Sequence, residues 1–173
     1  MSDIVVKDSK GRPQQICMQA FGTSCGPASV AMTERIYKHL SRSDEQRALN
    51  LSQKYPGRWD IDVGSTMNNI TSVLNAEGVQ AYKETYVGGG GVYSYLKYYA
   101  CFSTPVIAHI QWSNTSAHAV VCAIHDDDDT FVFFDPWYLI VEVRGSDLPN
   151  YTVSGVMGTA TGTLSGWLVV THH

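Results

Sequence analysis

The stretch Thr23-Ser24-Cys25-Gly26-Pro27-Ala28-Ser29-Val30-Ala31-Met32 decides the fold, because a loop turns into an apolar helix within it. Pro27 suits the first helical turn, where the N–H that proline lacks would have no intrahelical partner. An oxygen of Thr23 or Ser24 is expected to cap the helix. The apolar face predicts a buried core helix that runs to about residue 40, on Val30, Ala31, Met32, Ile36 and Leu40.

Cys25 is the candidate nucleophile of this stretch. At the start of a helix, its sulfur lies at the positive end of the helix dipole, which favours thiolate over thiol. Gly26 lets a second chain, such as a substrate, come close to the backbone beside the sulfur. The alternative is that Cys25 is a small buried apolar residue, as free cysteines often are. Partners elsewhere in the chain decide between the two interpretations.

The composition describes a single globular domain over residues 1–173, with 44% hydrophobic and 16% charged residues. A net charge of −4 argues against a nucleic-acid partner, because basic residues are not in excess. There is no apolar run of about 18 residues, so no membrane span is expected. Met1–Asp8 lacks the apolar core of a signal peptide, so the protein is expected in the cytoplasm or exported as an effector by a signal-less route. The oligomeric state stays open.

The chain has three further cysteines, Cys17, Cys101 and Cys122. No Cys-x-x-Cys pair occurs, which argues against a zinc knuckle and against a thioredoxin motif. The spacing shows no disulfide framework either. All three side chains are therefore expected to pack as buried apolar groups.

The helical half of the domain is predicted to cover about residues 14–102, and residues 1–22 are expected to form an irregular or short extended arm. The pattern after the Cys25 helix predicts a polar helix from Ser41 to near Tyr55, a helix capped by Ser65 and stopped by Gly78, a short strand over 79–87 and a Tyr-rich helix over 92–101. Gly88-Gly89-Gly90-Gly91 is expected to be a hinge. No Lys-Ser/Thr follows these glycines, which argues against a phosphate-binding loop.

The sheet half is predicted to cover about residues 103–173. Its expected strands are 106–112, 118–124, 131–134, 138–143 and 166–171. Asp126-Asp127-Asp128-Asp129 lies between two of them and lacks the spacing of an EF-hand calcium loop, so it is interpreted as a solvated hairpin tip. Helices followed by antiparallel strands indicate an α+β domain with segregated layers.

Two residues of the sheet half meet the needs of a cysteine nucleophile. His118 begins one expected strand and Asp135 ends the next, so a hairpin would bring both to the same open end. The carboxylate can hold the imidazole in one tautomer and support its cationic form. His118 can then take the proton of Cys25 and later protonate the leaving amine.

A donor for the developing oxyanion is expected in the loop before the helix. Gln19 lies six residues before Cys25, and its amide, together with the backbone N–H of Cys25, could form an oxyanion hole. Gln14 or Gln15 could serve instead if the loop runs differently.

The motifs Gln19-x5-Cys25-Gly-Pro-Ala-Ser, His118-Ala-Val and Asp135-Pro resemble those of the papain-like cysteine peptidases. Within these, the chain is most similar to the bacterial double-glycine leader (bacteriocin-processing) peptidases and related bacterial effector proteases. The resemblance covers about residues 14–143 and implies a central helix carrying the cysteine, packed on an antiparallel sheet carrying His and Asp. Cys-Gly-Pro-Ala departs from the Cys-x-x-Cys-Trp of the larger papain enzymes, and Asp135 stands where many plant and lysosomal members have Asn.

The expected function is that of a cysteine endopeptidase acting on a peptide or protein through a thioester acyl-enzyme, without metal or cofactor. Cys25 would attack, His118 would serve as base and then acid, Asp135 would orient His118, and Gln19 would stabilise the oxyanion. Trp112 and Trp137 are expected to shield the site or to line the substrate cleft.

Three alternatives stay open at this point. The same thiol chemistry could serve a deamidase, a transglutaminase or a peptidoglycan amidase, because the acyl-enzyme is common to all of them. The domain could also be a catalytically silent peptide-binding module. A metal site from His109, His118, His125 and the four aspartates is the least favoured, because no His-x-His or His-x3-His spacing occurs.

Overall fold

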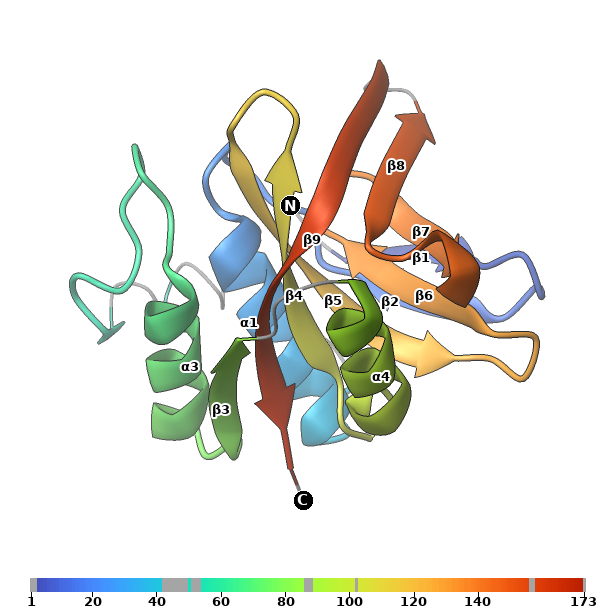
Figure 1. Cartoon of the computed structure of the whole chain (residues 1–173). Coiled ribbons are helices and arrows are strands. Elements are labelled where there is room, and N and C mark those ends of the chain that lie inside the picture. Colours follow the sequence, from blue (N-terminus) through green and yellow to red (C-terminus); the bar gives the residue numbers. More distant parts are fainter. Residues whose placement is uncertain are drawn as a thin grey trace.

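The chain folds into a mixed α+β domain, which confirms the fold class expected from the sequence (Figure 1). The computed structural model describes residues 3–41, 50, 54–85, 89–101, 103–155 and 158–172. Within them the helices are α1 (Cys25–Tyr37), α3 (Met67–Ala76) and α4 (Gly89–Tyr99), with a short 3-10 turn η1 (Gly145–Asp147). The expected polar helix after residue 41 lies mostly outside the described residues.

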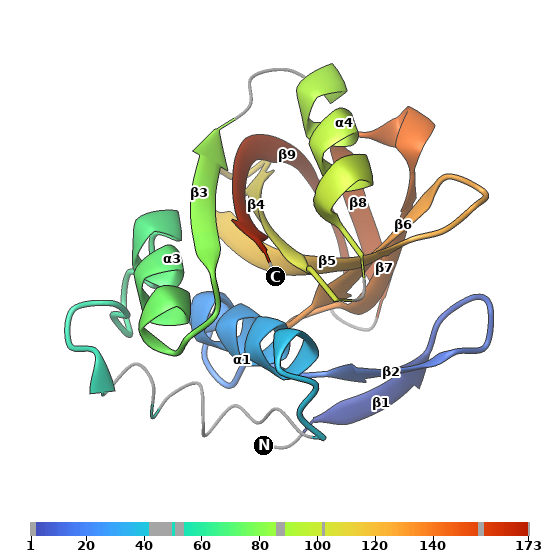
Figure 2. The ribbon, with the colours of Figure 1, turned by 90° about the horizontal axis from the view of Figure 1, so that it is seen from below.

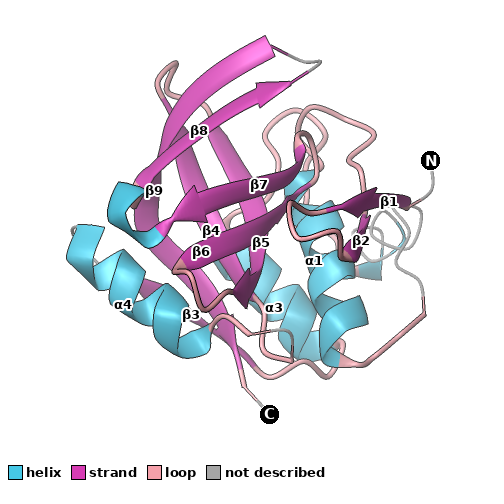
Figure 3. Cartoon of the chain, turned by 90° about the vertical axis from the view of Figure 1, so that its right-hand side faces the viewer, coloured by secondary structure: helices cyan, strands magenta, loops and turns pink. Residues whose placement is uncertain are grey.

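The strands form a two-stranded sheet and a seven-stranded antiparallel sheet (Figures 1 and 3). The strands are β1 (Ile4–Lys7), β2 (Pro13–Ile16), β3 (Ala81–Thr85), β4 (Val106–Trp112), β5 (Ala117–His125), β6 (Thr130–Asp135), β7 (Leu139–Arg144), β8 (Asn150–Gly155) and β9 (Gly158–Thr171). The order in the large sheet is β3-β9-β4-β5-β6-β7, and β8 pairs with β9 off this path. β1 and β2 pair separately, within the predicted extended arm.

The large sheet is covered on both faces. Figure 2 shows α1 and α3 on one side of the curved sheet and α4 on the other. Successive strand residues point to opposite faces, so Ile107 and Phe134 pack against α1 while Ala108 and Phe133 pack against α4. We call these two sets of buried side chains the α1 core and the α4 core. The α4 core also contains Tyr151 of β8.

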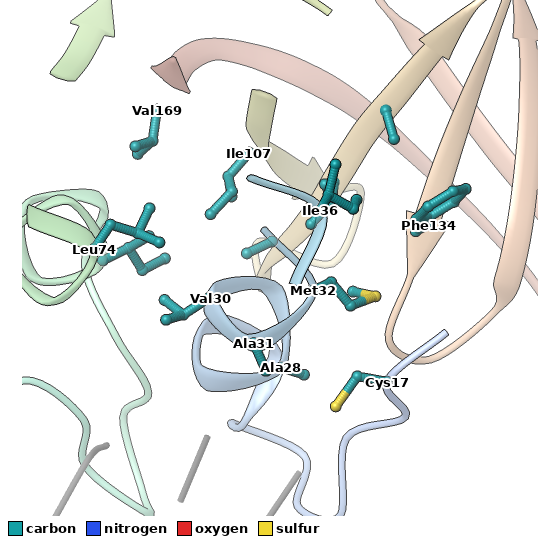
Figure 4. Packing of buried hydrophobic residues seen from close by; sticks show 14 of the residues in the cluster. Cys17, Ala28, Val30, Ala31, Met32, Ile36, Leu74, Ile107, Phe134 and Val169 are labelled. Atoms are coloured by element: carbon teal, nitrogen blue, oxygen red, sulfur yellow. The ribbon is translucent and has the colours of Figure 1, made fainter. Parts of the chain in front are cut away.

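α1 is buried along nearly its whole length, from Gly26 to Ile36. Figure 4 shows its side chains Val30 and Met32 packed between Leu74 of α3 and Phe134 of β6. The helix expected at Cys25 is therefore the central helix of the α1 core. It ends at Tyr37, slightly before the predicted end, because the backbone at His39 turns into the left-handed region with φ 53°.

The helix caps differ from the predicted ones. The hydroxyl of Ser24 does not cap α1; it accepts from Phe21 N and donates to Phe21 O, at 3.0 and 3.1 Å, and so closes the loop before the helix. α3 is capped by Thr66, whose side chain accepts from Asn69 N at 3.1 Å, and not by Ser65. Ser65 donates instead to Arg58 O. Both serine hydroxyls therefore bond backbone groups of the loops and do not cap the helices.

Three of the four glycines expected to form a hinge belong to a helix, and Gly88 lies outside the described residues. Gly89, Gly90 and Gly91 form the first turn of α4, although glycine disfavours helix by about 1 kcal/mol per residue. The apolar side of this helix overrides that propensity, because Val92 and Leu96 are fully buried in the α4 core.

The C-terminal strands extend beyond the prediction. β9 has 14 residues and begins at Gly158, not near residue 166, and β8 was not predicted at all. The signal for β8 is an alternation in which Tyr151 and Val153 are buried while Thr152 and Ser154 are exposed. β8 and β9 form a hairpin whose side chains Tyr151 and Val153 pack into the α4 core. The sheet therefore looks closed in Figure 2.

The aspartate run forms the predicted hairpin tip between β5 and β6. Asp126 accepts two hydrogen bonds from Arg12, at 2.7 and 2.8 Å, and Arg12 also bonds Asp8 at 2.6 Å. The tip is thereby tied to the hairpin of β1 and β2. Asp126 and Asp128 also form ion pairs with Lys10. The described part of the chain contains no cluster of three or more His, Cys, Asp or Glu side chains suited to a metal ion.

The three further cysteines differ in burial. Cys17 and Cys122 are buried as expected, but Cys101 is exposed, because the chain turns out of the α4 core after Ala100. Among the described residues, no helix combines the length and the apolar character that crossing a bilayer requires.

Gly162→Ala is expected to destabilise the fold by about 1–3 kcal/mol, because its methyl group would overpack the sheet. A Cβ at Gly162 would lie 2.7 Å from side-chain atoms of both Ile110 and Trp112. The matched control is Gly90→Ala, which meets no atom within 4 Å and lies in α4. It should stabilise the fold by about 0.5–1 kcal/mol. Denaturant unfolding measures both, and an unchanged Gly162→Ala would contradict the packing.

Candidate active site

Cys25 is the first residue of α1 and lies at the end of the sheet where β5 begins. Its side chain is partly buried and packs against the α1 core. Gly26 is buried beside it, and a Cβ there would lie 2.7 Å from Ser65 Cβ. The space that Gly26 leaves is therefore taken by Ser65, and the residue is absent from the linings of the cavities described below.

His118 is the second residue of β5 and contacts both Cys25 and Asp135. Its Nε2 lies 2.8 Å from Asp135 Oδ1, and the side chain is 7% exposed. Because Nε2 is engaged by the carboxylate, the other ring nitrogen, Nδ1, is left for the hydrogen bond that the imidazole makes with Cys25. The predicted hairpin thus brings His118 and Asp135 together, and the start of α1 brings the Cys25 side chain into contact with the same imidazole.

Cys25, His118 and Asp135 shift one another's pKa values toward the charged forms. Burial alone would raise the pKa of Cys25, but the hydrogen bond and positive charge of His118, with the backbone N–H groups of Ala119 and Gly26, hold it below the ordinary value. Burial alone would lower the pKa of His118, but the charge and hydrogen bond of Asp135 and the contact with Cys25 raise it to about 10. Between the two pKa values the pair exists as thiolate and imidazolium.

Asp135 ends β6 and is fully buried. Its Oδ1 also accepts from the backbone N–H groups of Trp137 and Tyr138, at 2.8 and 3.0 Å. Its Oδ2 accepts from the hydroxyl of Tyr151 at 2.8 Å. Burial would raise the pKa of Asp135, but the charge of His118 and these donors keep it below the ordinary value. The carboxylate therefore stays ionised while buried.

Gln19 lies beside this group and is 8% exposed. Its backbone N–H donates to Pro136 O at 3.0 Å, which fixes the loop before α1 against the turn after Asp135. Its side-chain Nε2 donates one hydrogen to Phe21 O at 2.7 Å and has a second hydrogen to offer. Gln14 and Gln15 instead donate to Asp8 and Asp3 in the β1–β2 hairpin, so Gln19 alone of the three lines a cavity with His118.

Trp112 and Trp137 line that cavity, which has a volume of about 460 Å³. The Trp112 ring stacks on the imidazole of His118, with centroids 5.8 Å apart and planes 28° apart. Trp112 also contacts the rings of Tyr138 and Tyr151. An indole over the imidazole keeps water from one face of the ring.

A second cavity of about 570 Å³ contains Cys25. His109 and Trp167 line its sheet side, and the segment from Asp62 to Met67 lines its α3 side. Both cavities are lined by Gly22, Ser116, Ala117 and His118, so they adjoin at His118. Together they offer an extended chain room beside Cys25 and beside His118.

Sequence reasoning missed Tyr151, His109 and the segment from Asp62 to Met67. Tyr151 lies on the unpredicted strand β8. Its contact with Asp135 could not be predicted from the sequence, because it depends on how β8 folds back onto the sheet. The sequence pattern points to His109 only as a possible metal ligand. In the structure its Nδ1 bonds Ser165 Oγ at 2.7 Å, and His109 lines the Cys25 cavity.

A family model and two solved structures match this chain. A model of the Peptidase_C39-like family matches residues 8–144. Among solved structures, a double-glycine motif protease from an AMS/PCAT transporter, in complex with its leader peptide, superposes with a TM-score of 0.58 at 17% identity, covering 99% of this chain and 94% of that chain. The Pseudomonas avirulence protein AvrPphB gives a TM-score of 0.43 at 15% identity, covering 72% and 76%. The curated proteins contain no match.

The chain belongs to the Peptidase_C39-like family, because the family match spans most of its length. It is a cysteine protease with the fold of the papain-like peptidases. The resemblance drawn from the sequence motifs is thereby confirmed.

Iodoacetamide at mildly acidic pH is expected to alkylate Cys25 before any other cysteine, because a lowered pKa leaves thiolate there. The competitor is the exposed Cys101, whose pKa burial would raise but the hydroxyls of Ser103 and Thr104 lower. The measurement is therefore made by mass spectrometry in Cys101→Ser. His118→Ala should shift alkylation to higher pH, and an unshifted profile would contradict the pairing.

Proposed function

We propose that this protease is an endopeptidase in which Cys25, His118, Asp135 and Gln19 carry out the reaction. The observation that carries the proposal is the placement of His118 between Cys25 and Asp135: its Nε2 lies 2.8 Å from Asp135 Oδ1, and its imidazole also bonds the Cys25 side chain. A cysteine at a helix N-terminus, a histidine and an orienting carboxylate are the groups that thiol-based acyl transfer requires.

The reaction begins with attack of the Cys25 thiolate on the scissile carbonyl, which forms the C–S bond and places negative charge on the carbonyl oxygen. The backbone N–H of Cys25 and the second hydrogen of Gln19 Nε2 would donate to this oxyanion. The His118 imidazolium gives its proton to the leaving amine as the C–N bond breaks. A thioester remains on Cys25.

Hydrolysis of the thioester uses the same groups in reverse. Neutral His118 takes a proton from water, which attacks the thioester carbonyl and releases the carboxylate product and the thiolate. Asp135 holds the imidazole in one orientation throughout, through the bond between its Oδ1 and Nε2. The stacked Trp112 limits the water that reaches the ring.

The substrate is a polypeptide that extends on both sides of the cleaved bond. The acyl half would lie in the cavity containing Cys25, and the leaving half would lie in the cavity containing His118, Trp112 and Trp137. Room on both sides favours an endopeptidase over an exopeptidase. The leader peptide bound to the similar double-glycine protease agrees with a peptide substrate.

Deamidase, transglutaminase and peptidoglycan amidase activity would use the same thioester with other acceptors or donors. A catalytically silent binding module would keep the cavities without turnover. A cleavage profile on a peptide library separates a peptidase from an amidase and gives its cleavage specificity at once.

Cys25→Ala is expected to abolish cleavage of the library while leaving the fold intact, because only the nucleophile is removed. Gln19→Ala should lower kcat by about 10²–10³-fold through loss of one oxyanion donor. Gln15→Ala is the matched control, because its amide is used in the β1–β2 hairpin. Mass spectrometry of the cleaved peptides and circular dichroism give the two readouts. Residual cleavage by Cys25→Ala would exclude the mechanism.

The pH profile of kcat/KM is expected to fall on its alkaline side near the pKa of His118, about 10, where the imidazolium is lost. Asp135 raises this pKa, so Asp135→Asn should move the alkaline limb to lower pH as well as reducing kcat. Initial rates on a cleaved peptide between neutral and alkaline pH measure the shift. A limb that stays in place would show that Asp135 does not act on His118.

A further inference from the structure

Tyr151 is a buried tyrosine whose hydroxyl reaches the candidate site from the α4 core. It is fully buried on β8, and its Oη donates to Asp135 Oδ2 at 2.8 Å. It lies beyond residues 8–144, to which the family model is matched. Neither the family motif nor the hairpin of β5 and β6 accounts for its position.

The two oxygens of Asp135 have different surroundings. Oδ1 accepts from His118 Nε2 and from the backbone N–H groups of Trp137 and Tyr138. Among the described residues, Tyr151 is the one donor recorded for Oδ2. A buried carboxylate oxygen without a donor is costly, because neither water nor protein then compensates its charge. The Tyr151 hydroxyl supplies this compensation.

Tyr151 is held so that it can act only as a donor. Its ring meets Phe133 edge to face at a centroid distance of 5.3 Å and lies 5.9 Å from Trp112. Burial and the charge of Asp135 raise the pKa of Tyr151 well above its ordinary value, so the hydroxyl keeps its proton.

The other titratable groups around Tyr151 and Asp135 are His118 and Cys122 of β5 and Tyr138 after β6. Burial raises the pKa of Cys122, and burial followed by the charge of Asp135 raises that of Tyr138, so both stay neutral. His118 is therefore the one cation facing the carboxylate among these groups. His118 on β5 bonds Asp135 Oδ1, and the hydroxyl of Tyr151 on β8 bonds Asp135 Oδ2.

We propose that Tyr151 is a positioning residue of the active site: its hydroxyl holds Asp135 Oδ2 so that Oδ1 stays ionised and aligned with His118. This inference rests on the proposed function. Tyr151 acts through Asp135 and His118 and touches no substrate, and its ring also supports the Trp112 that stacks on His118. The C-terminal hairpin of β8 and β9 is thereby part of the catalytic apparatus.

Tyr151→Phe removes the hydroxyl and keeps the ring contacts. Without its donor the Asp135 carboxylate is less stable in its ionised form, so it takes up a proton at higher pH and supports the His118 imidazolium less well. The acid limb of Cys25 alkylation by iodoacetamide, measured in Cys101→Ser, should move to higher pH. On a cleaved peptide, kcat should fall about 10-fold with KM unchanged.

Tyr93→Phe is the matched control. The Tyr93 hydroxyl also donates to an aspartate, Asp129, at 3.0 Å, and the ring also packs edge to face on a phenylalanine, Phe131. Neither Tyr93 nor Asp129 lines either cavity of the site. The alkylation profile and kcat of Tyr93→Phe should overlay those of the parent protein. A Tyr151→Phe profile that also overlays the parent would overturn the inference.

Site-specific 3-fluorotyrosine at position 151 supplies a second variant that keeps the hydroxyl and strengthens it as a donor. The acid limb should then move to lower pH, opposite to Tyr151→Phe. Movement in the same direction as Tyr151→Phe would indicate a packing effect and overturn the proposal. The alkylation readout needs no peptide, so absence of peptide cleavage in the parent protein would defeat the proposed function while these shifts still test Tyr151.

Discussion

The hydrogen bond between His118 Nε2 and Asp135 Oδ1 is the interaction on which the site depends. It joins adjacent strands, β5 and β6, at the rim of the sheet, where both side chains are buried. Because one ring nitrogen is fixed on the carboxylate, the other can only face away from it, toward the start of α1. The sheet thus sets the direction of the imidazole, and the central helix needs only to deliver the sulfur to that point.

The delivery of the sulfur follows from burial of α1. Residues Gly26 to Ile36 are buried, so the helix cannot slide or rotate without breaking its packing against β5 and α3. Ser29 Oγ also donates to Ala119 O at 3.2 Å, the residue next to His118. A packed helix and one polar contact therefore fix Cys25 relative to β5, which is the condition for a stable thiolate–imidazolium pair.

Much of this arrangement could be predicted from the sequence, because it depends on local signals. Cys25-Gly-Pro marks a helix start, and His118 and Asp135 lie at matching ends of two apolar strands separated by an obvious hairpin tip. What escaped prediction depends on closure of the sheet. β8 is a polar-looking strand whose Tyr151 is buried only because the long β9 carries it back over the α4 core. The helical glycines before Val92 escaped for a similar reason, since tertiary packing overrides their propensity.

The burial of Asp135 is hard to explain by stability alone. Removing a carboxylate from water costs several kcal/mol, and an apolar side chain of similar volume often serves a core as well or better. Here the fold surrounds the carboxylate with four donors from three segments of the chain: His118, the turn at Trp137 and Tyr138, and Tyr151. Those donors keep the charge in place and hold it against the imidazole. A module that only bound peptides would gain nothing from an ionised group at the bottom of its core, whereas a thiolate that must stay charged beside a buried imidazole requires one.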